Sequence, residues 1–127
     1  MNTLDLNDKG NNLEVLAQVT VDKMKSCLNT VADMLLSAEE LNLLEPAALT
    51  AMVSKLNHAP TSNDTKFLVF YYRMKLIAIR DVFYEYVPLE TQASPWGEQF
   101  IGLIIHLGIP ASAAYYDLVN RSATVGR

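Results

Sequence analysis

The sequence predicts an all-α protein, a compact single-domain bundle of about five or six helices. Apolar residues of the N-terminal third recur at alternating steps of three and four, the period of a helix. Five Gly and five Pro are few for a β-fold with many turns. The apolar pattern from Lys66 to Tyr86 is unbroken over a length that favours a helix over a strand. With 127 residues, 50% of them hydrophobic, the chain is long enough for one core, which we assign to residues 12–121.

The first predicted helix extends from about Asn12 to Ser37, after a flexible leader at residues 1–11. Its apolar stripe consists of Leu13, Ala17, Thr20, Met24, Cys27, Val31 and Met34. The stripe resembles a heptad seam, but it is short for a coiled coil and contains the polar Thr20. We therefore expect this helix to lie on the core of its own domain, and we keep a homodimer seam as the alternative.

Shorter elements follow the first helix. The segment Ser37–Glu40 fits a capping box, which predicts a short helix from Ala38 to Leu43. Pro46 suits the first position of a third helix, which we expect to end at about His58. Residues 59–64 are polar and rich in turn-forming residues, so they form the next connection.

The fourth predicted helix, from about Thr65 to Val87, is the aromatic-rich central element of the bundle. Asp64 or Thr65 is its expected cap. It contains seven of the eleven aromatic residues: Phe67, Phe70, Tyr71, Tyr72, Phe83, Tyr84 and Tyr86. Because apolar residues point in nearly every direction around this helix, we expect it to be buried.

The last part of the chain predicts two helices with a break between them. After a loop at residues 88–94, Ser94 is the expected cap of a fifth helix that extends to Leu107. Gly108 is typical of a helix C-terminus. Pro110 would then begin a sixth helix, which we expect to end at about Arg121, before a flexible tail at residues 122–127.

No motif in the sequence indicates a catalytic or metal site. Cys27 lies on the apolar stripe, where a cysteine usually serves as a small buried hydrophobe. His58 and His106 lie near predicted helix C-termini, where the helix dipole favours a positive imidazole. Metal-ligand spacings, a glycine-rich phosphate loop and a nucleophile elbow are all missing from the sequence. We therefore predict a protein that is not an enzyme and that has no cofactor and no metal.

The sequence also predicts a cytoplasmic location without a membrane span. Its single cysteine suits a reducing compartment, and its polar beginning does not resemble a signal peptide. The most plausible span, Phe67–Val87, carries five charged side chains, which oppose insertion into a membrane.

Charge is distributed unevenly, and this asymmetry suggests a partner. Residues 1–64 have a net charge of −5, and residues 65–127 have a net charge of +1. Lys66, Arg73 and Arg80 are seven residues apart and share one side of the fourth helix. We favour their pairing with the acidic first half of the chain, and the alternative is an acidic surface of another protein.

Aromatic residues and arginine together are typical of protein interfaces. The candidate partner-binding residues are therefore Lys66, Arg73, Arg80, Tyr72 and Tyr84. A mean hydropathy of +0.12 further suggests that apolar surface remains for a partner or for a second copy of the chain. We predict a non-enzymatic interaction protein: a small adaptor, accessory subunit, inhibitor or chaperone-like regulator.

The alternative function is a DNA-binding regulator. Residues 100–121 have the form of a helix-turn-helix, in which Tyr115, Tyr116, Asn120 and Arg121 would face DNA. However, the second helix carries a single base, Arg121, and the chain is acidic overall. Few phosphate contacts would be available, which argues against nucleic acid as a partner.

Overall fold

The computed structural model describes the backbone of residues 3–125 and the side chains of residues 12–121. Every regular element of residues 3–125 is a helix, which confirms the predicted all-α class. The elements are α1 (Thr3–Glu40), α2 (Pro46–Leu56), α3 (Thr65–Tyr86), the single turn α4 (Leu89–Gln92), α5 (Pro95–Gly102), the π-helical segment η1 (Leu103–Gly108) and α6 (Ile109–Val125).

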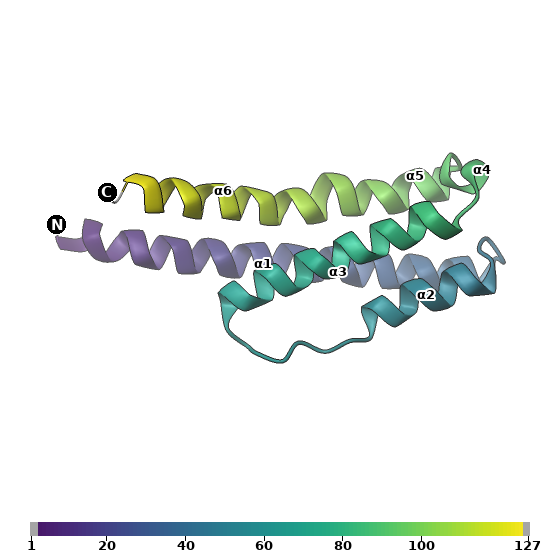
Figure 1. Ribbon diagram of the computed structural model, residues 1–127, viewed down its shortest axis with the longest axis horizontal. Coiled ribbons are helices and arrows are strands. Elements are labelled where there is room, and N and C mark those ends of the chain that lie inside the picture. The colour runs from purple at the N-terminus through teal and green to yellow at the C-terminus, as the bar shows by residue number, and fades with distance from the viewer. Residues whose placement is uncertain (1–2, 126–127) are drawn as a thin grey trace.

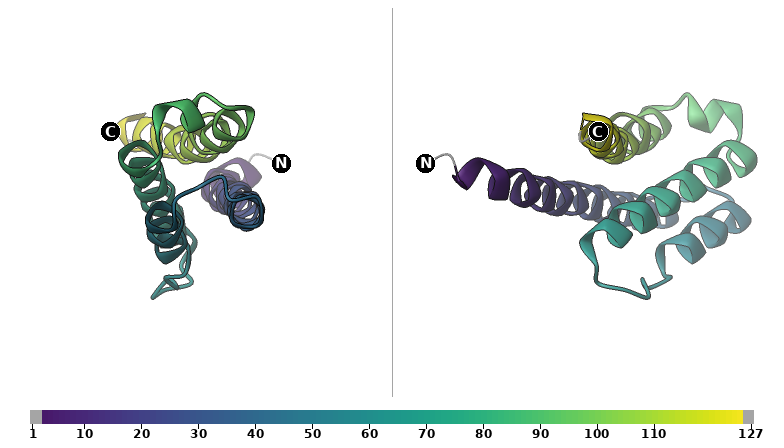
Figure 2. Two further views of the ribbon diagram at one scale, coloured as in Figure 1. Left: turned by 90° about the vertical axis from the view of Figure 1, so that its right-hand side faces the viewer. Right: turned by 60° about the vertical axis from the view of Figure 1, so that its left-hand side comes forward.

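Successive long helices alternate in direction along the bundle (Figure 1). α5, η1 and α6 follow one another without a break and form a single C-terminal rod, which lies antiparallel to α1. α3 packs against α1, α2, η1 and α6, so it is the central element. Seen end-on in Figure 2, α1, α3 and the C-terminal rod surround a shared interior.

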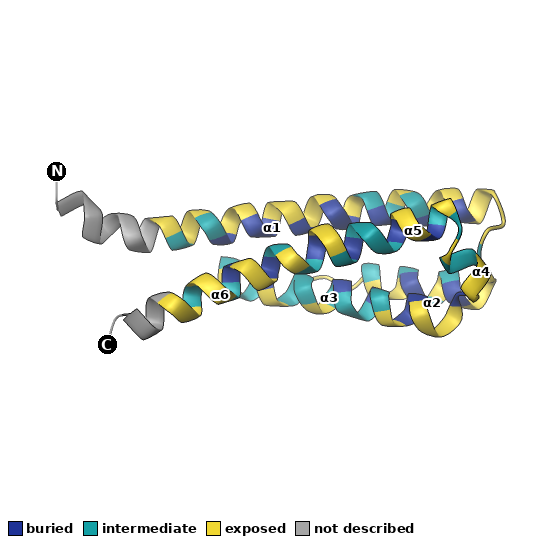
Figure 3. Cartoon of the chain, turned by 90° about the horizontal axis from the view of Figure 1, so that it is seen from above, coloured by how far each residue is buried: buried dark blue, intermediate teal, exposed yellow. Residues whose placement is uncertain are grey.

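The core follows the inner faces of these three elements (Figure 3). Most of the predicted stripe of α1, including Ala17, Met24 and Val31, is buried against the rest of the chain. Thr20 is also buried, and its hydroxyl donates to the Leu16 carbonyl at 2.8 Å, which satisfies it locally. The stripe therefore faces the core of its own domain, as predicted, and is not available as a homodimer seam.

An aromatic cluster joins α3 to α5 at the bundle end remote from the chain termini. The Phe83 and Phe100 rings stack with their centroids 5.4 Å apart, and the Trp96 ring stacks on Phe100 at 4.9 Å. The Trp96 indole N–H donates to the Met34 carbonyl of α1 at 3.3 Å. Three helices are thus fixed together around one set of rings.

α3 is the central helix of the bundle, as predicted, but fewer of its aromatic side chains are buried than expected. Of its seven aromatic residues, only Phe83 is fully buried. Phe70, Tyr84 and Tyr86 are about half exposed, at 53%, 50% and 47%. The neighbouring helices cover only part of the circumference of α3, and the remaining aromatic surface faces solvent.

The end of α1 also differs from the prediction, because the helix continues through Ser37 to Glu40. The Leu43 N–H donates to the Ala38 carbonyl at 2.9 Å, and the Asn42 N–H donates to the Glu39 carbonyl at 3.2 Å. These bonds close a helix C-terminus, and Asn42 adopts the required left-handed conformation, with φ of 54°. The predicted short helix Ala38–Leu43 is therefore not formed, since its first residues belong to α1.

The first and last helices both extend closer to the chain termini than predicted. α1 begins at Thr3, so it includes most of the predicted leader, and α6 continues past Arg121 to Val125. Gly10 lies within α1, because a glycine costs only about 1 kcal/mol inside a helix and does not force it to end. Residues 1–2 and 126–127, the remainder of the predicted leader and tail, lie outside the described residues.

Several predicted helix starts are confirmed. The Asp64 carboxylate accepts from the Phe67 N–H at 3.1 Å and caps α3. The Ser94 hydroxyl accepts from the Gly97 N–H at 3.2 Å and caps α5. Pro46 begins α2 as predicted. The segment 88–94, predicted as a loop, contains the one-turn helix α4.

The predicted break at Gly108 is absent, and so is the helix-turn-helix. The Ile109 N–H donates to the Ile104 carbonyl, five residues earlier, so the backbone crosses this region as a π-helix. Pro110, which lacks an N–H, is the second residue of α6, just beyond this irregular segment. His106 therefore lies midway along a continuous rod rather than near a helix C-terminus.

Gly108 is required by packing rather than by a turn. None of the glycines in the described residues has a positive φ. A Cβ added at Gly108 would lie 2.7 Å from Leu76 Cδ1 and 3.1 Å from Cys27 Sγ. The glycine thus lets the C-terminal rod approach α1 and α3 closely.

Candidate functional site

The predicted basic edge of α3 does not form one exposed surface. Lys66 is exposed. The Arg73 guanidinium lies 5.9 Å from the centre of the Tyr116 ring on α6, and its Nε is buried without a hydrogen-bond partner. Arg80 Nη2 pairs with Asp81 Oδ1 at 3.1 Å. Among residues 12–121, none of the three forms the predicted ion pair with the acidic first half.

The two candidate tyrosines lie in different environments. Tyr72 is half-buried and meets the Tyr71 ring edge-on at 5.2 Å. Tyr84 is exposed and packs edge-on against Phe83 at 5.6 Å. The five residues predicted to bind a partner are therefore not gathered into one site, because two of the three bases are engaged by other side chains.

Lys75, which the sequence analysis did not select, has the most specific role among the bases of α3. Its Nζ donates to the carbonyls of Leu56 and His58, both at 2.7 Å, and so closes the C-terminal end of α2. The Tyr71 hydroxyl also donates to the His58 carbonyl, and the Lys75 ammonium lies 5.0 Å from the Tyr71 ring centre. Burial lowers the pKa of Lys75 and raises that of Tyr71.

Beside this contact lies an open apolar groove, which we call the Phe70 groove. It encloses about 340 Å³ and is lined by Lys55, His58, Phe67, Phe70, Tyr71, Met74, Lys75 and Ala78. Phe70 and Met74, one helical turn apart, are 53% and 45% exposed. No acidic residue lines the groove, whereas two lysines do.

The groove exists because α2 is much shorter than α3. α2 has 11 residues and α3 has 22. α2 ends where the Leu56 carbonyl meets Lys75, near the middle of α3, and an extended connection continues in the direction of α2 to the start of α3 (Figure 1). The face of α3 from Phe67 to Met74 therefore has no helix against it. Comparing the two predicted helix lengths would have revealed this gap, but the aromatic residues all around α3 obscured it.

The residues predicted to face DNA do not form a reading surface. Tyr115 is buried, and Tyr116 lies under Arg73. Asn120 is exposed, and Arg121 pairs with Asp117 of its own helix at 3.2 Å. DNA binding stays a prediction, without the helix-turn-helix on which it depended.

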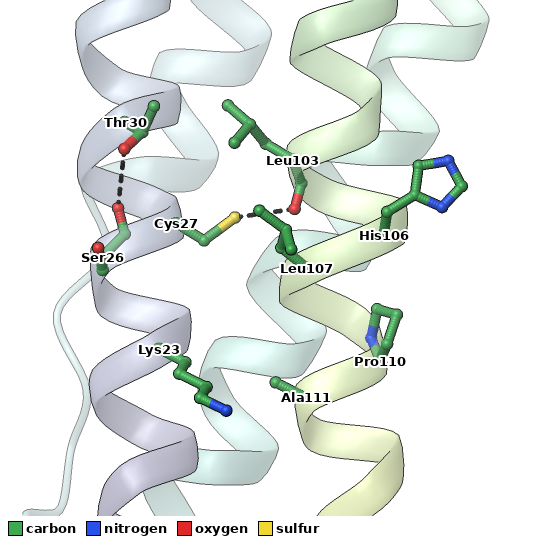
Figure 4. A pocket seen from close by; sticks show the side chains of 9 residues that line it. All are labelled: Lys23, Ser26, Cys27, Thr30, Leu103, His106, Leu107, Pro110 and Ala111. Carbon is green, nitrogen blue, oxygen red and sulfur yellow. Dashed lines mark hydrogen bonds between the residues drawn. The ribbon is translucent and has the colours of Figure 1, made fainter.

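A second hollow, of about 550 Å³, lies between α1 and the C-terminal rod beside η1 (Figure 4). Its lining includes Cys27, whose thiol donates to the Leu103 carbonyl at 3.1 Å. Burial raises the pKa of this thiol from 9.0 to about 11. The His106 ring, although it borders the hollow, points away from Cys27 in Figure 4. The two side chains therefore do not make the thiol–imidazole pair that activates a nucleophilic cysteine.

Cys27 is expected to react slowly with a thiol reagent. A pKa of about 11 in place of 9.0 leaves about 100-fold less thiolate at pH 8, and the side chain is only 6% exposed. Labelling with Ellman's reagent at pH 8 should thus be at least about 100-fold slower in the folded protein than in urea. Equal rates in the two states would show that the thiol is exposed and not hydrogen-bonded.

The same raised pKa makes stability depend on pH. The folded state holds the Cys27 proton more tightly than the unfolded state, so this contribution to stability is complete below pH 9.0. It is lost as the pH rises from 9.0 to about 11. Unfolding curves at several pH values should show a smaller alkaline loss of stability in a Cys27→Ala variant.

No protein-family model, curated protein or solved structure matches this chain.

Within the described residues, no group of three or more His, Cys, Asp or Glu side chains is placed to hold a metal ion. Among the described residues, one helical stretch, Pro95–Arg121, is long and apolar enough to cross a membrane by length and composition alone. Of its most apolar 18 residues, 22% are buried. The cytoplasmic location stays a prediction.

Proposed function

We propose that the protein is a non-enzymatic adaptor or accessory subunit that binds an acidic amphipathic helix of another protein in the Phe70 groove. The observation that carries this proposal is the exposed pair Phe70 and Met74 inside a groove whose charged lining residues are all basic. Aromatic residues and methionine are enriched at protein interfaces, and methionine adapts to differently shaped partners.

The geometry of the groove favours a helix as its occupant. Phe70 and Met74 are four residues apart, so they present two contacts one helical turn apart along an apolar surface. An amphipathic helix binds such a groove through anchors with the same spacing. The place beside α3 that such a helix would occupy is the one that α2, ending at Leu56, leaves open.

The charges around the groove favour an acidic partner. Lys55 and Lys75 both line it, and Lys66 is exposed on the same half of α3. Opposite charges at the edge of an interface speed association and disfavour partners of the wrong sign. A helix that carries glutamate or aspartate beside its apolar anchors would satisfy both features.

Two synthetic peptides test the proposal. Both have leucines at helical i and i+4 positions, and they differ only in having glutamate or lysine at the flanking positions. By fluorescence anisotropy at moderate salt, we expect the glutamate peptide to bind in the micromolar range and Phe70→Ser to weaken it about tenfold or more. Leu118→Ser on α6 is the control, because Leu118 is also a large exposed apolar residue, at 42% against 53% for Phe70, and it does not line the groove. Unchanged binding to the Phe70→Ser protein would overturn the proposal.

A further inference from the structure

A second apolar surface lies at the end of the bundle remote from the chain termini, where α1 turns into α2 and α3 turns through α4 into α5 (Figure 1). We call it the leucine end and define it by five exposed residues: Leu36, Leu41, Leu43, Tyr86 and Leu89. Leu41 and Leu89 are 65% and 80% exposed, so neither serves the core. Large apolar side chains that gather at one exposed end are typical of an interaction site.

The charges at this end are all of one sign. Five exposed glutamates accompany the leucines: Glu39, Glu40, Glu45, Glu85 and Glu90. No lysine or arginine occurs from Asp33 to Ser54 or from Asp81 to Asn120. Among the described residues, none of these five glutamates belongs to an ion pair. The leucine end is therefore apolar and acidic, the opposite of the Phe70 groove.

The connections that carry these residues are held in place. The hydrogen bonds that close α1 fix the turn at Asn42, between Leu41 and Leu43. The Gln92 side-chain amide donates to the Val87 carbonyl at 2.8 Å, across the turn that carries Leu89. The Trp96 bond to the Met34 carbonyl ties the start of α5 to α1. A surface fixed in this way loses little conformational entropy when a partner binds.

We propose that the leucine end is a docking surface for a basic amphipathic helix of another protein. Leucines of the docked helix would pack on Leu41 and Leu89, and its lysines or arginines would meet the surrounding glutamates. Charge complementarity decides the class of partner, because an acidic helix would be repelled by these glutamates, none of which forms an ion pair among the described residues. Together with the Phe70 groove, the leucine end would let one small protein join two partners of opposite charge.

The probe for this surface is the lysine peptide, which has leucines at i and i+4 and lysine at the flanking positions. We expect it to bind the wild-type protein, and we expect the double variant Leu41→Ser/Leu89→Ser to bind it about tenfold or more weakly. Glu40→Gln/Glu90→Gln should also weaken binding and reduce its dependence on salt. This second variant keeps the test valid if the serine variant does not fold. Phe70→Ser is the control and should bind the lysine peptide within about twofold of wild type.

Four results would overturn the proposal. They are absence of binding to the lysine peptide, equal binding to wild type and to a folded Leu41→Ser/Leu89→Ser protein, self-association of the chain through the same leucines, and binding of phosphatidylcholine vesicles in place of the peptide. The two proposed surfaces are tested separately, because Phe70→Ser affects only the glutamate peptide and the leucine-end variants affect only the lysine peptide.

Discussion

Replacing Phe83 by alanine is expected to lower the free energy of unfolding by about 3–5 kcal/mol, the range for a large aromatic residue removed from a core. Phe83 is completely buried, it stacks on Phe100, and its ring centre lies 6.5 Å from that of Trp96. These rings join α3 to α5, and Trp96 is bonded to α1. Truncation at Phe83 therefore leaves a cavity where three helices meet. Urea unfolding followed by circular dichroism measures the loss.

Phe70→Ala is the matched control, with the same residue type in the same helix. Phe70 is 53% exposed and faces the groove, so its truncation is expected to cost less than about 1 kcal/mol. Similar losses for the two variants would contradict the structure, because they would mean that Phe70 is as well packed as Phe83. They would also remove the basis for a partner-binding groove, since a packed Phe70 would not be available to a partner.

Local signals in the sequence predicted much of this fold. Asp64, Ser94 and Pro46 were expected to begin helices and do so, because a cap or an initial proline acts on its own first turn. The stripe on α1 was also predicted, since its periodicity follows the helix itself. What these features share is that only neighbours within a few residues decide them.

The predictions that differ from the structure concern features that depend on elements distant in the sequence. Which aromatic residue of α3 is buried depends on where α2 ends, and the pattern of α3 does not contain that information. Arg73 was expected to meet acidic groups of the first half of the chain or of a partner, but Tyr116 of α6 lies beside it. Lys75 was passed over, although the end of α2 comes within hydrogen-bond distance of it. The surroundings of these side chains therefore depend on how α2 and α6 pack on α3.

Gly108 is the case in which a local signal was misleading, and replacing it by leucine is expected to destabilise the protein by about 3 kcal/mol. A Cβ alone would lie 2.7 Å from Leu76 Cδ1, and Leu76 is fully buried, so it has little room to move. Cys27 Sγ blocks a second direction at 3.1 Å. Leucine at this position would therefore push the C-terminal rod away from α1 and α3. Thermal and urea unfolding of the purified variant measure the change.

Gly102→Ala in the same rod is the control that separates crowding from helix propensity. The nearest atom to a Cβ there is His106 Cδ2 at 3.7 Å, an ordinary contact. This variant is therefore expected to gain up to about 1 kcal/mol, since alanine favours a helix more than glycine does. Leu76→Ala removes the atoms that a side chain at position 108 would meet. In that background, the loss of stability caused by Gly108→Leu should be smaller by about 1 kcal/mol or more. If Gly108 instead ended a helix, the cost of leucine would be the same with or without Leu76, because a turn does not depend on the side chain packed against it.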